Sequence, residues 1–338
     1  MALRVAIIGC GLIGQKRARA LQNAQLIAAA DTVFERAARL AAQHPRCEAM
    51  ADWRACIARP DVDAVIVSTI NASLAEITQQ AVEHGKHVLV EKPAARSARE
   101  LEPALELTRR VGVVVKVGFN HRFHPAFSKA RELFDAGAIG PALYVRARYG
   151  HGGRIGYDRE WRADPTLAGG GELLDQGVHL IDLARWFLGD FAEVSGHVDT
   201  FFWDMPVEDN GFLLLKTAGG RVAWLHASCT EWKNLFSFEL FGRDGKLEVD
   251  GLGGSYGVER LTHYRMLPQM GLPETTMWEY PGADNSWDLE FADFAEAIAQ
   301  RREPLGTLHD AMAALEVIGR VYEQSAGLRA ILPIRQAG

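Results

Sequence analysis

The sequence predicts an α/β protein of two domains. The first is a doubly wound parallel sheet, and the second is an α+β domain with an open, mainly antiparallel sheet. Residues 1–120 alternate short apolar runs with segments of helical period. From residue 121 the alternation stops, and β-rich runs separated by turn signals follow one another. The length of 338 residues also suits about two domains, which we place at 1–120 and 121–338.

The first domain contains apolar runs that predict strands buried on both faces. Segments of helical period lie between them, several opened by Asp or Ser as candidate N-caps. The predicted strands are 3–8, 26–31, 47–50, 64–68, 87–91 and 113–119. The predicted helices are 12–24, 34–43, 52–58, 73–84 and 97–110. Strands and helices in this order imply a parallel sheet with helices on both of its faces.

The second domain combines a small number of helices with a long series of strands. The predicted helices are 125–136, 171–188, 287–300 and 308–324, the last with Thr307 as N-cap and Gly327 just past its end. The predicted strands are 142–149, 194–203, 210–217, 221–230, 236–241 and 246–249. Because short turns join successive strands, we expect a mainly antiparallel sheet.

The composition excludes several classes of partner. Lys and Arg number 37 against 43 Asp and Glu, and no block of five like charges occurs, so we expect neither a nucleic-acid nor a membrane partner. No apolar run approaches the roughly 18 residues of a membrane span. The four cysteines have unrelated spacings, which predicts reduced thiols, no metal site and a cytoplasmic location.

A glycine-rich segment follows the first predicted strand and opens a helix: Gly9-Cys10-Gly11-Leu12-Ile13-Gly14. The first glycine permits a tight turn, the second lets the backbone approach a pyrophosphate, and the third lets helix and strand pack closely. The pyrophosphate would lie at the positive end of the helix. The segment therefore predicts a dinucleotide site, although the same pattern also occurs as a simple tight turn.

Asp31 ends the second predicted strand, where a carboxylate can bind both ribose hydroxyls of the adenosine. A carboxylate there repels a 2′-phosphate, so the sequence favours NAD over NADP. Arg36 is a possible partner for a 2′-phosphate, but its position predicts that it lies inside the helix. The alternative for Asp31 is a helix N-cap ahead of Phe34.

Two further segments carry polar groups suited to catalysis. Glu91-Lys92-Pro93 ends the fifth strand of the first domain, and ligands bind outside the carboxyl ends of parallel strands. The peptide bond before Pro93 is a candidate for the cis form. In the predicted helix 171–188, a spacing of 100° per residue places the polar side chains on one sector of about 120°. They are Glu172, Asp175, Gln176, His179 and Asp182. This stripe either lines a cleft or meets water.

Together these segments resemble the Gfo/Idh/MocA oxidoreductases. The resemblance rests on the glycine segment, on Glu91-Lys92-Pro93, on Asn120-His121-Arg122-Phe123 and on the helix that contains Asp175 and His179, and it extends over essentially the whole chain. It implies a Rossmann domain, an NAD-dependent oxidation of a CH–OH group, and Lys92, Asp175 and His179 as the catalytic residues. The chain departs from the family pattern at Ile70 and Leu74, where the family often has Pro and His.

The motifs and the resemblance together assign residues to the cofactor and to the substrate. The expected cofactor residues are Gly9, Gly11, Leu12, Ile13, Gly14, Asp31, Thr69, Asn71, Glu91 and Lys92. The expected substrate residues are Asn120, His121, Arg122, His151, Arg154, Trp161, Arg162 and Gln176. The aromatic, basic and small residues of the loop 151–162 suit a polyhydroxylated ligand, although this loop can equally be structural. His121 and Arg122 can instead anchor the domain junction.

We expect His179 to be the acid/base, because an imidazole titrates near neutral pH. Asp175 would orient that ring or bind a neighbouring hydroxyl, and Lys92 would stabilise a developing alkoxide. Lys92 and His179 can exchange these roles.

The family's substrates are inositols, sugars and their derivatives. The alternatives to a dehydrogenase are a glycosidase that retains its NAD and a non-catalytic NAD-binding regulator. Apolar strands such as 212–215 and 222–225 also predict a homodimer or homotetramer formed through the second domain's sheet.

Overall fold

A computed structural model describes residues 2–331 of the chain, with side chains up to residue 326. The described chain forms two compact units. The first contains the residues up to Asn120 together with Asn285–Met312, and the second contains His121–Asp284 together with the chain from Ala313 onward. The sequence pattern predicts Asn285–Met312 as part of the second domain. These residues join the first unit because Phe291 and Phe294 pack into its core.

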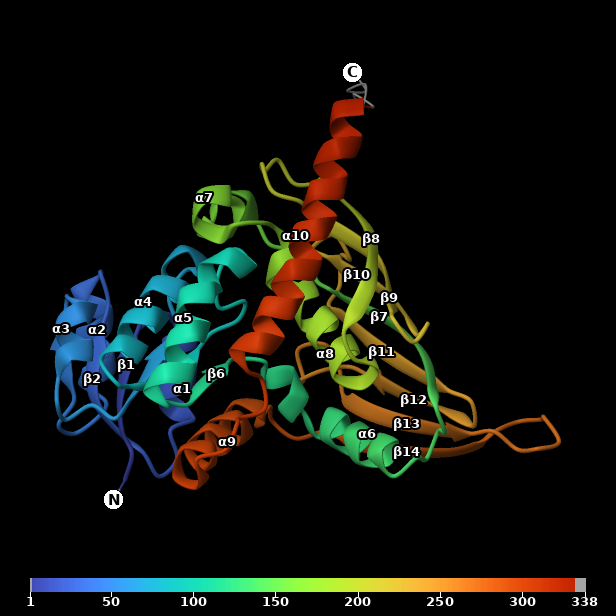
Figure 1. Cartoon of the computed structure of the whole chain (residues 1–338), viewed down its shortest axis with the longest axis horizontal. Coiled ribbons are helices and arrows are strands. Elements are labelled where there is room, and N and C mark those ends of the chain that lie inside the picture. The colour runs from blue at the N-terminus through green and yellow to red at the C-terminus, as the bar shows by residue number, and fades with distance from the viewer. Residues whose placement is uncertain (1, 332–338) are drawn as a thin grey trace. The chain divides into compact units, whose positions relative to one another are not determined.

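The first unit contains a six-stranded parallel sheet with the strand order β3-β2-β1-β4-β5-β6. Its strands β1, β2 and β6 are labelled in Figure 1. Its strands are β1 (Arg4–Ile8), β2 (Gln25–Ala30), β3 (Glu48–Met50), β4 (Ala64–Val67), β5 (His87–Val90) and β6 (Val115–Val117). Its helices are α1 (Leu12–Arg19), α2 (Phe34–Ala41), α3 (Trp53–Ala58), α4 (Asn71–Glu83), α5 (Ala98–Val111) and α9 (Ser286–Gln300), followed by the start of α10 (Leu308–Ile331). The predicted fold of the first domain is confirmed.

The strand order determines where a ligand can bind. The chain runs from β1 to β2 and β3 in one direction and then returns to β4 on the other side of β1. In such sheets ligands usually bind outside the carboxyl ends of the two strands at which the direction of winding changes, and these strands are β1 and β4 here. Gly9 follows β1 there, and Ser68 follows β4. The two segments are in contact, because Ser68 Oγ donates a hydrogen bond of 2.7 Å to the carbonyl oxygen of Gly9.

The second unit contains an eight-stranded sheet with the order β14-β13-β12-β11-β7-β10-β9-β8. Its strands are β7 (Ala142–Gly150), β8 (Phe191–Asp199), β9 (Asn210–Thr217), β10 (Val222–Ser228), β11 (Leu235–Gly242), β12 (Gly245–Asp250), β13 (Glu259–Arg265) and β14 (Glu274–Tyr280). All neighbouring pairs are antiparallel except β7 and β10, which are parallel. The prediction of an open, mainly antiparallel sheet is confirmed.

The helices of the second unit are η1 (Asn120–Phe123), α6 (Pro125–Asp135), η2 (Tyr157–Arg159), η3 (Trp161–Ala163), α7 (Pro165–Ala168), η4 (Leu173–Gly177) and α8 (Val178–Leu188). Of these, α6, η4 and α8 pack on one face of the sheet. Alternate residues of the strands point toward these helices, so Leu213 and Leu215 of β9 are buried while Leu214 between them is 53% exposed. The helix α10 runs beside β8, where Ser325 Oγ accepts a hydrogen bond from Val198 N (Figure 1).

Several elements of the second unit differ from the prediction. The predicted strand 194–203 ends at Asp199, because the buried Asp209 carboxylate accepts the backbone N–H groups of Phe201, Phe202 and Trp203. Those donors are therefore not available to a neighbouring strand. The strands β13 and β14 were not predicted, because polar residues are frequent in both and the apolar pattern is weak.

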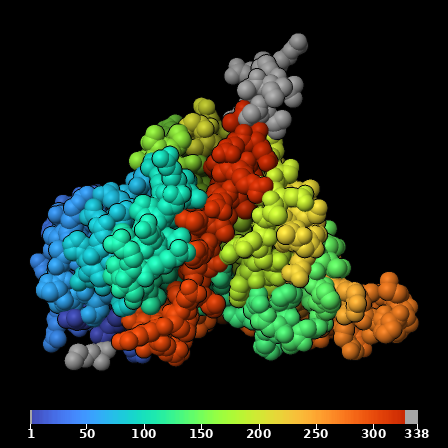
Figure 2. Space-filling model, in the orientation of Figure 1, coloured from blue at the N-terminus to red at the C-terminus, as the bar shows by residue number. Residues whose placement is uncertain are grey.

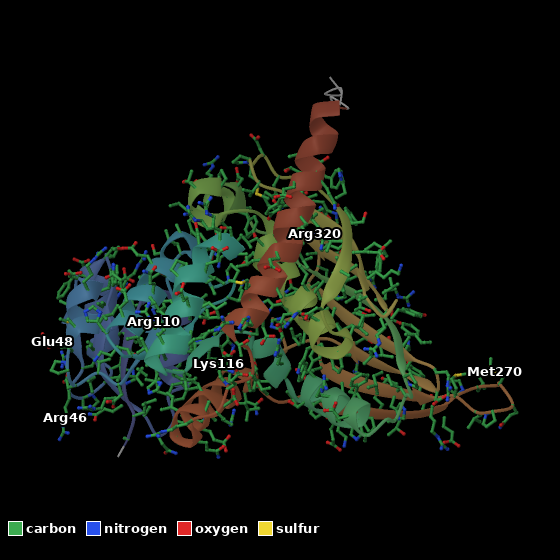
Figure 3. All side chains as sticks on the ribbon, viewed as in Figure 1. Arg46, Glu48, Arg110, Lys116, Met270 and Arg320 are labelled. Atoms are coloured by element: carbon green, nitrogen blue, oxygen red, sulfur yellow. The ribbon has the colours of Figure 1, made fainter. Side chains whose placement is uncertain are left out.

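The loop that joins β13 to β14 projects away from the sheet, as Figure 2 shows in orange. Met270 lies at its end (Figure 3) and is 77% exposed. At the other end of the unit, α10 continues through Gly327, where the sequence predicted a stop. None of the helices in the described part of the chain is long and apolar enough to cross a membrane.

Candidate active site

The glycine segment has the geometry that a dinucleotide requires. Gly9 has a φ of +91°, and a Cβ there would lie 2.4 Å from the carbonyl oxygen of Ser68. A Cβ at Gly14 would lie 2.0 Å from the carbonyl oxygen of Gly9. At Gly11, in contrast, a Cβ would meet no atom within 4 Å, and no side chain caps α1. The backbone at Gly11 and the start of α1 is therefore open to an anionic ligand, and this fits a pyrophosphate.

Asp31 is buried directly after β2 and holds two backbone groups. Its Oδ2 accepts a hydrogen bond of 2.8 Å from Cys10 N, and its Oδ1 accepts one of 2.8 Å from Val33 N. The residue before α2 is Val33, so Asp31 is not the N-cap of that helix. A carboxylate can accept about four hydrogen bonds, so Asp31 keeps acceptor capacity for ribose hydroxyls. Arg36 Nη1 lies 4.0 Å from Oδ1.

The end of β4 supplies the next expected cofactor residues. Thr69 donates a hydrogen bond of 3.3 Å to the carbonyl oxygen of Ile70. Asn71 is buried as the first residue of α4. Both residues belong to the chain segment that packs on the glycine segment through Ser68.

The segment after β5 makes a tight turn. The peptide bond between Lys92 and Pro93 is cis, and Ala94 N donates a hydrogen bond of 2.9 Å to the carbonyl oxygen of Glu91. Glu91 Oε1 accepts a hydrogen bond of 2.6 Å from Arg17 Nε, and the arginine side chain is fully buried. Lys92 follows Glu91 directly and is partly exposed.

In the second unit, the two imidazole rings of His121 and His179 stack on each other. Their centroids are 3.8 Å apart with 21° between the planes. Both side chains are buried, and Tyr149 of β7 packs against them with its centroid 5.3 Å from that of His121. Burial raises the pKa of Tyr149 well above its usual value, so its hydroxyl keeps its proton and hydrogen-bonds with Tyr256.

The helix that carries His179 does not start as an α-helix. Residues Leu173–Gly177 form a π-helical turn, and the α-helix begins at Val178. The assumed spacing of 100° per residue is therefore wrong for the segment around Asp175. The stripe is not solvated as a whole, because Glu172 and Asp182 are only 1% exposed. A π-turn often marks a functional site, since its extra residue redirects the side chains.

Asp175 and Glu172 have different partners. Asp175 Oδ2 accepts a hydrogen bond of 3.2 Å from Arg162 Nε. Glu172 accepts one of 3.4 Å from the hydroxyl of Tyr157 and lies 3.5 Å from His151 Nε2. Burial lowers the pKa of His151, and its Nδ1 accepts a hydrogen bond from Gly153 N. His151 is therefore a neutral ring at pH 7, with its proton on Nε2, the nitrogen that lies 3.5 Å from Glu172 Oε1.

The structure gives the other expected substrate residues varied surroundings. Arg122 forms a buried bidentate ion pair with Asp182, at 2.5 and 2.9 Å. Arg154 is exposed and pairs with Glu160, and Arg162 lies over the ring of Trp161. Gln176 is half-buried in the π-turn. Asn120 belongs to the first unit, where its Nδ2 donates to Ser286 Oγ at 3.0 Å.

Some polar residues of the second unit were missed by sequence reasoning. Glu208 Oε1 accepts hydrogen bonds from Tyr322 of α10 at 2.7 Å and from Leu173 N at 3.2 Å. These bonds attach α10 to the start of the π-turn. Burial raises the pKa of Glu208. Nothing in the sequence indicates that Glu208 and Tyr322 are in contact. Glu172, in contrast, lies in the same predicted helix as Asp175 and is one of its polar residues.

Family models match both units. A model described as "Oxidoreductase family, NAD-binding Rossmann fold" matches residues 3–119. A second, described as "GFO/IDH/MocA C-terminal domain", matches residues 127–248.

Similar proteins agree with these matches. A dTDP-3,4-didehydro-2,6-dideoxy-α-D-glucose 3-reductase of Streptomyces violaceoruber is 33% identical over 309 residues, which cover 90% of this chain and 88% of the relative. An NAD(+)-dependent scyllo-inositol 2-dehydrogenase of Bacillus subtilis is 29% identical over 330 residues, covering 93% and 92%. The solved structure of a levoglucosan dehydrogenase with NADH and levoglucosan has a TM-score of 0.87 at 25% identity, covering 97% and 98%. The chain therefore belongs to the Gfo/Idh/MocA family of NAD-dependent oxidoreductases, with the NAD-binding Rossmann fold in its first unit.

Proposed function

We propose that this protein oxidises a secondary hydroxyl of a cyclitol, a sugar or a sugar derivative with NAD. The observation that carries the proposal is the polar cluster of the second unit, where the Asp175–Arg162 pair and the stacked His121 and His179 lie around one π-turn. Charged groups and an imidazole suit a ligand with several hydroxyls. The related proteins are named for inositol, levoglucosan and a deoxy-sugar nucleotide, which supports the same substrate class.

In this proposal Gly9, Gly11, Leu12, Ile13 and Gly14 hold the pyrophosphate, Asp31 binds the adenosine ribose, and Thr69 and Asn71 contact the nicotinamide half. When bound, NAD accepts the hydride that leaves the carbinol carbon. His179 removes the hydroxyl proton, so a C–H and an O–H bond break while a C=O bond forms. Lys92 donates a hydrogen bond to the reacting oxygen and stabilises its developing negative charge.

Asp175 is proposed to bind a hydroxyl next to the reacting carbon. Arg162 Nε holds the carboxylate from one side, which fixes its direction. His151, with its proton on Nε2, and the exposed Arg154 are proposed to contact hydroxyls or an acidic group farther along the ligand. Trp161 and Gln176 complete this proposed substrate set, together with Asn120, His121 and Arg122.

The assignment of each domain's task is part of the proposal. The first unit binds the dinucleotide, and the second binds the substrate and forms the oligomer. Leu214 and Trp224 are cross-strand neighbours on the sheet face opposite the helices, and they are 53% and 40% exposed. We propose that a second copy covers this face in a homodimer or homotetramer of a cytoplasmic enzyme.

A panel of inositols, sugars and sugar acids, each with NAD and with NADP, tests the proposed function. We expect at least one polyol to reduce NAD, followed by the absorbance of the reduced nicotinamide, and NADP to be used poorly. NAD that copurifies, resists exchange and supports glycoside hydrolysis without net reduction would identify a glycosidase instead. Tight NAD binding with neither reaction would identify a regulator.

A further inference from the structure

Arg17 lies at the centre of a buried ion cluster in the first unit. Its side chain is fully buried in α1, the helix that begins at the glycine segment. Nε donates a hydrogen bond of 2.6 Å to Glu91 Oε1, and Nη1 donates one of 2.5 Å to Glu290 Oε2. The guanidinium also lies over the ring of Trp287, 4.4 Å from its centroid. One side chain therefore joins α1, the end of β5 and α9.

The surroundings leave little freedom for this cluster. A Cβ at Gly118, just after β6, would lie 2.7 Å from Arg17 Nη2 and 3.2 Å from Glu91 Oε2. Glycine at position 118 therefore leaves the space that the guanidinium and the Glu91 carboxylate occupy next to the end of β6. The planar guanidinium donates to both carboxylates, so it fixes the direction as well as the distance of each. The ammonium group of a lysine is a point charge and does not fix these directions.

Glu91 is also the residue immediately before Lys92. Its carbonyl oxygen accepts the N–H of Ala94, so the turn that carries Lys92 is anchored at Glu91 by both main chain and side chain. Glu91 is a cofactor residue in the sequence-based prediction, whereas in the structure its Oε1 accepts a hydrogen bond from Arg17.

We propose that Arg17 and Glu91 are positioning residues, which fix the turn bearing Lys92 relative to the helix that begins at the glycine segment. The inference rests on the proposed role of Lys92 in the reaction. Arg17 acts only through Glu91, because the guanidinium is enclosed by Glu91, Glu290, Trp287 and Gly118.

The variant Arg17→Lys keeps the charge and removes the fork. We expect kcat to fall by about 10- to 100-fold, because a misplacement of about 1 Å can cost roughly 10² in rate. The affinity for NAD should change little, since backbone groups of the glycine segment are proposed to hold the pyrophosphate. Glu91→Gln, which keeps a hydrogen-bond acceptor of the same shape, should lose less activity than Glu91→Ala.

Asp293→Asn is the matched control. Asp293 also lies on α9, and its partners are Lys116, at 2.8 Å, Arg302 and the N–H of Leu305 rather than Glu91 or Arg17. Its replacement should lower the melting temperature and leave kcat unchanged. If Arg17→Lys and Glu91→Gln likewise lower only the melting temperature, the cluster merely stabilises the fold and the inference is wrong.

Two further measurements separate the inference from the proposed function. In NAD-free protein, an amine-selective reagent followed by mass spectrometry should label Lys92 at a different rate in Arg17→Lys and at the normal rate in Asp293→Asn. Equal rates in all three proteins would contradict the inference without using activity. In a Lys92→Ala background, Arg17→Lys should cause no further loss of kcat. A Lys92→Ala variant with normal kcat would instead overturn the proposed role of Lys92.

Discussion

His121 and His179 are separated by 58 positions in the sequence, yet their rings stack with centroids 3.8 Å apart. His121 follows the first unit directly, in the short helix η1, and His179 lies in the first turn of α8. The ring of His121 therefore covers one face of the proposed acid/base and limits the orientations that it can adopt.

Replacing His121 tests whether this stacking matters for catalysis. His121→Ala should lower kcat by about 10-fold or more, because loss of orientation in a reacting group is costly. His121→Phe retains a flat ring of similar size and should keep more activity than His121→Ala. Equal kcat in the alanine variant and the unmodified protein would show that the stacking has no catalytic role.

Asp31→Ala should weaken NAD binding by about 10- to 100-fold, since hydrogen bonds to a charged group contribute about 1.5–3 kcal/mol. The preference against NADP should also relax. Asp31→Asn removes the negative charge, but its amide oxygen can still accept one of the two backbone N–H groups that the carboxylate binds. This variant therefore separates the effect of the charge on NADP from the loss of the local hydrogen bonds. Dissociation constants for NAD and NADP measured by calorimetry check this. Equal efficiency with both cofactors in the unmodified protein would contradict the assignment.

The stability of the first unit should fall in mild acid. Burial lowers the pKa of His87, and its Nδ1 accepts a hydrogen bond of 3.0 Å from Val114 N. A group whose pKa is lower in the folded state stabilises the fold fully above its unfolded pKa, near 6.5, and that contribution is lost as the pH falls toward the folded pKa.

Urea unfolding from about pH 7.5 to about pH 5.5 measures this dependence. His87→Asn offers an acceptor that takes up no proton, so it should flatten the decline. The exposed His84→Asn is the control and should leave the decline unchanged. A His87→Asn profile that matches the unmodified protein would mean that other groups cause the acid sensitivity.

The oligomer prediction concerns the open face of the second unit's sheet. A protein with both Leu214→Glu and Trp224→Glu should dissociate, because two buried charges would face the partner copy without counter-charges. Leu272→Glu, at a 92% exposed position outside this face, should leave the assembly intact. Light scattering reports the mass. A mass near 37.2 kDa for the unmodified protein at micromolar concentration would refute the prediction.

Local patterns in the sequence predict the first unit well and the second less well. The strands β1, β2, β4 and β5 are apolar on both faces, so each appears as an unbroken run. The predicted end of β8 was wrong, because aromatic residues such as those after Asp199 are common in strands. In the structure their N–H groups instead donate hydrogen bonds to the carboxylate of Asp209. The π-turn before α8 was missed because a fixed helical period cannot show an extra residue in one turn.

The candidate site shows the same division. The glycine segment, Asp31 and Lys92 are candidates from the sequence alone, because each follows a predicted strand in a recognisable pattern. The partners Arg17–Glu91, Arg122–Asp182 and Glu208–Tyr322 join residues that lie 60 or more positions apart, and no local pattern predicts such pairs.

The kinetics of Lys92→Ala, His179→Ala and the double variant on the best substrate of the panel test the central claim most directly. Each single variant should lower turnover by roughly 10²-fold or more, because acid–base assistance contributes about 10² to 10⁴ and an oxyanion-stabilising donor about 10² to 10³. The affinity for NAD, measured separately, should change little. The double variant should lose less than the product of the single losses, since both groups act on one transition state. Near-normal turnover in either single variant would contradict the proposed mechanism.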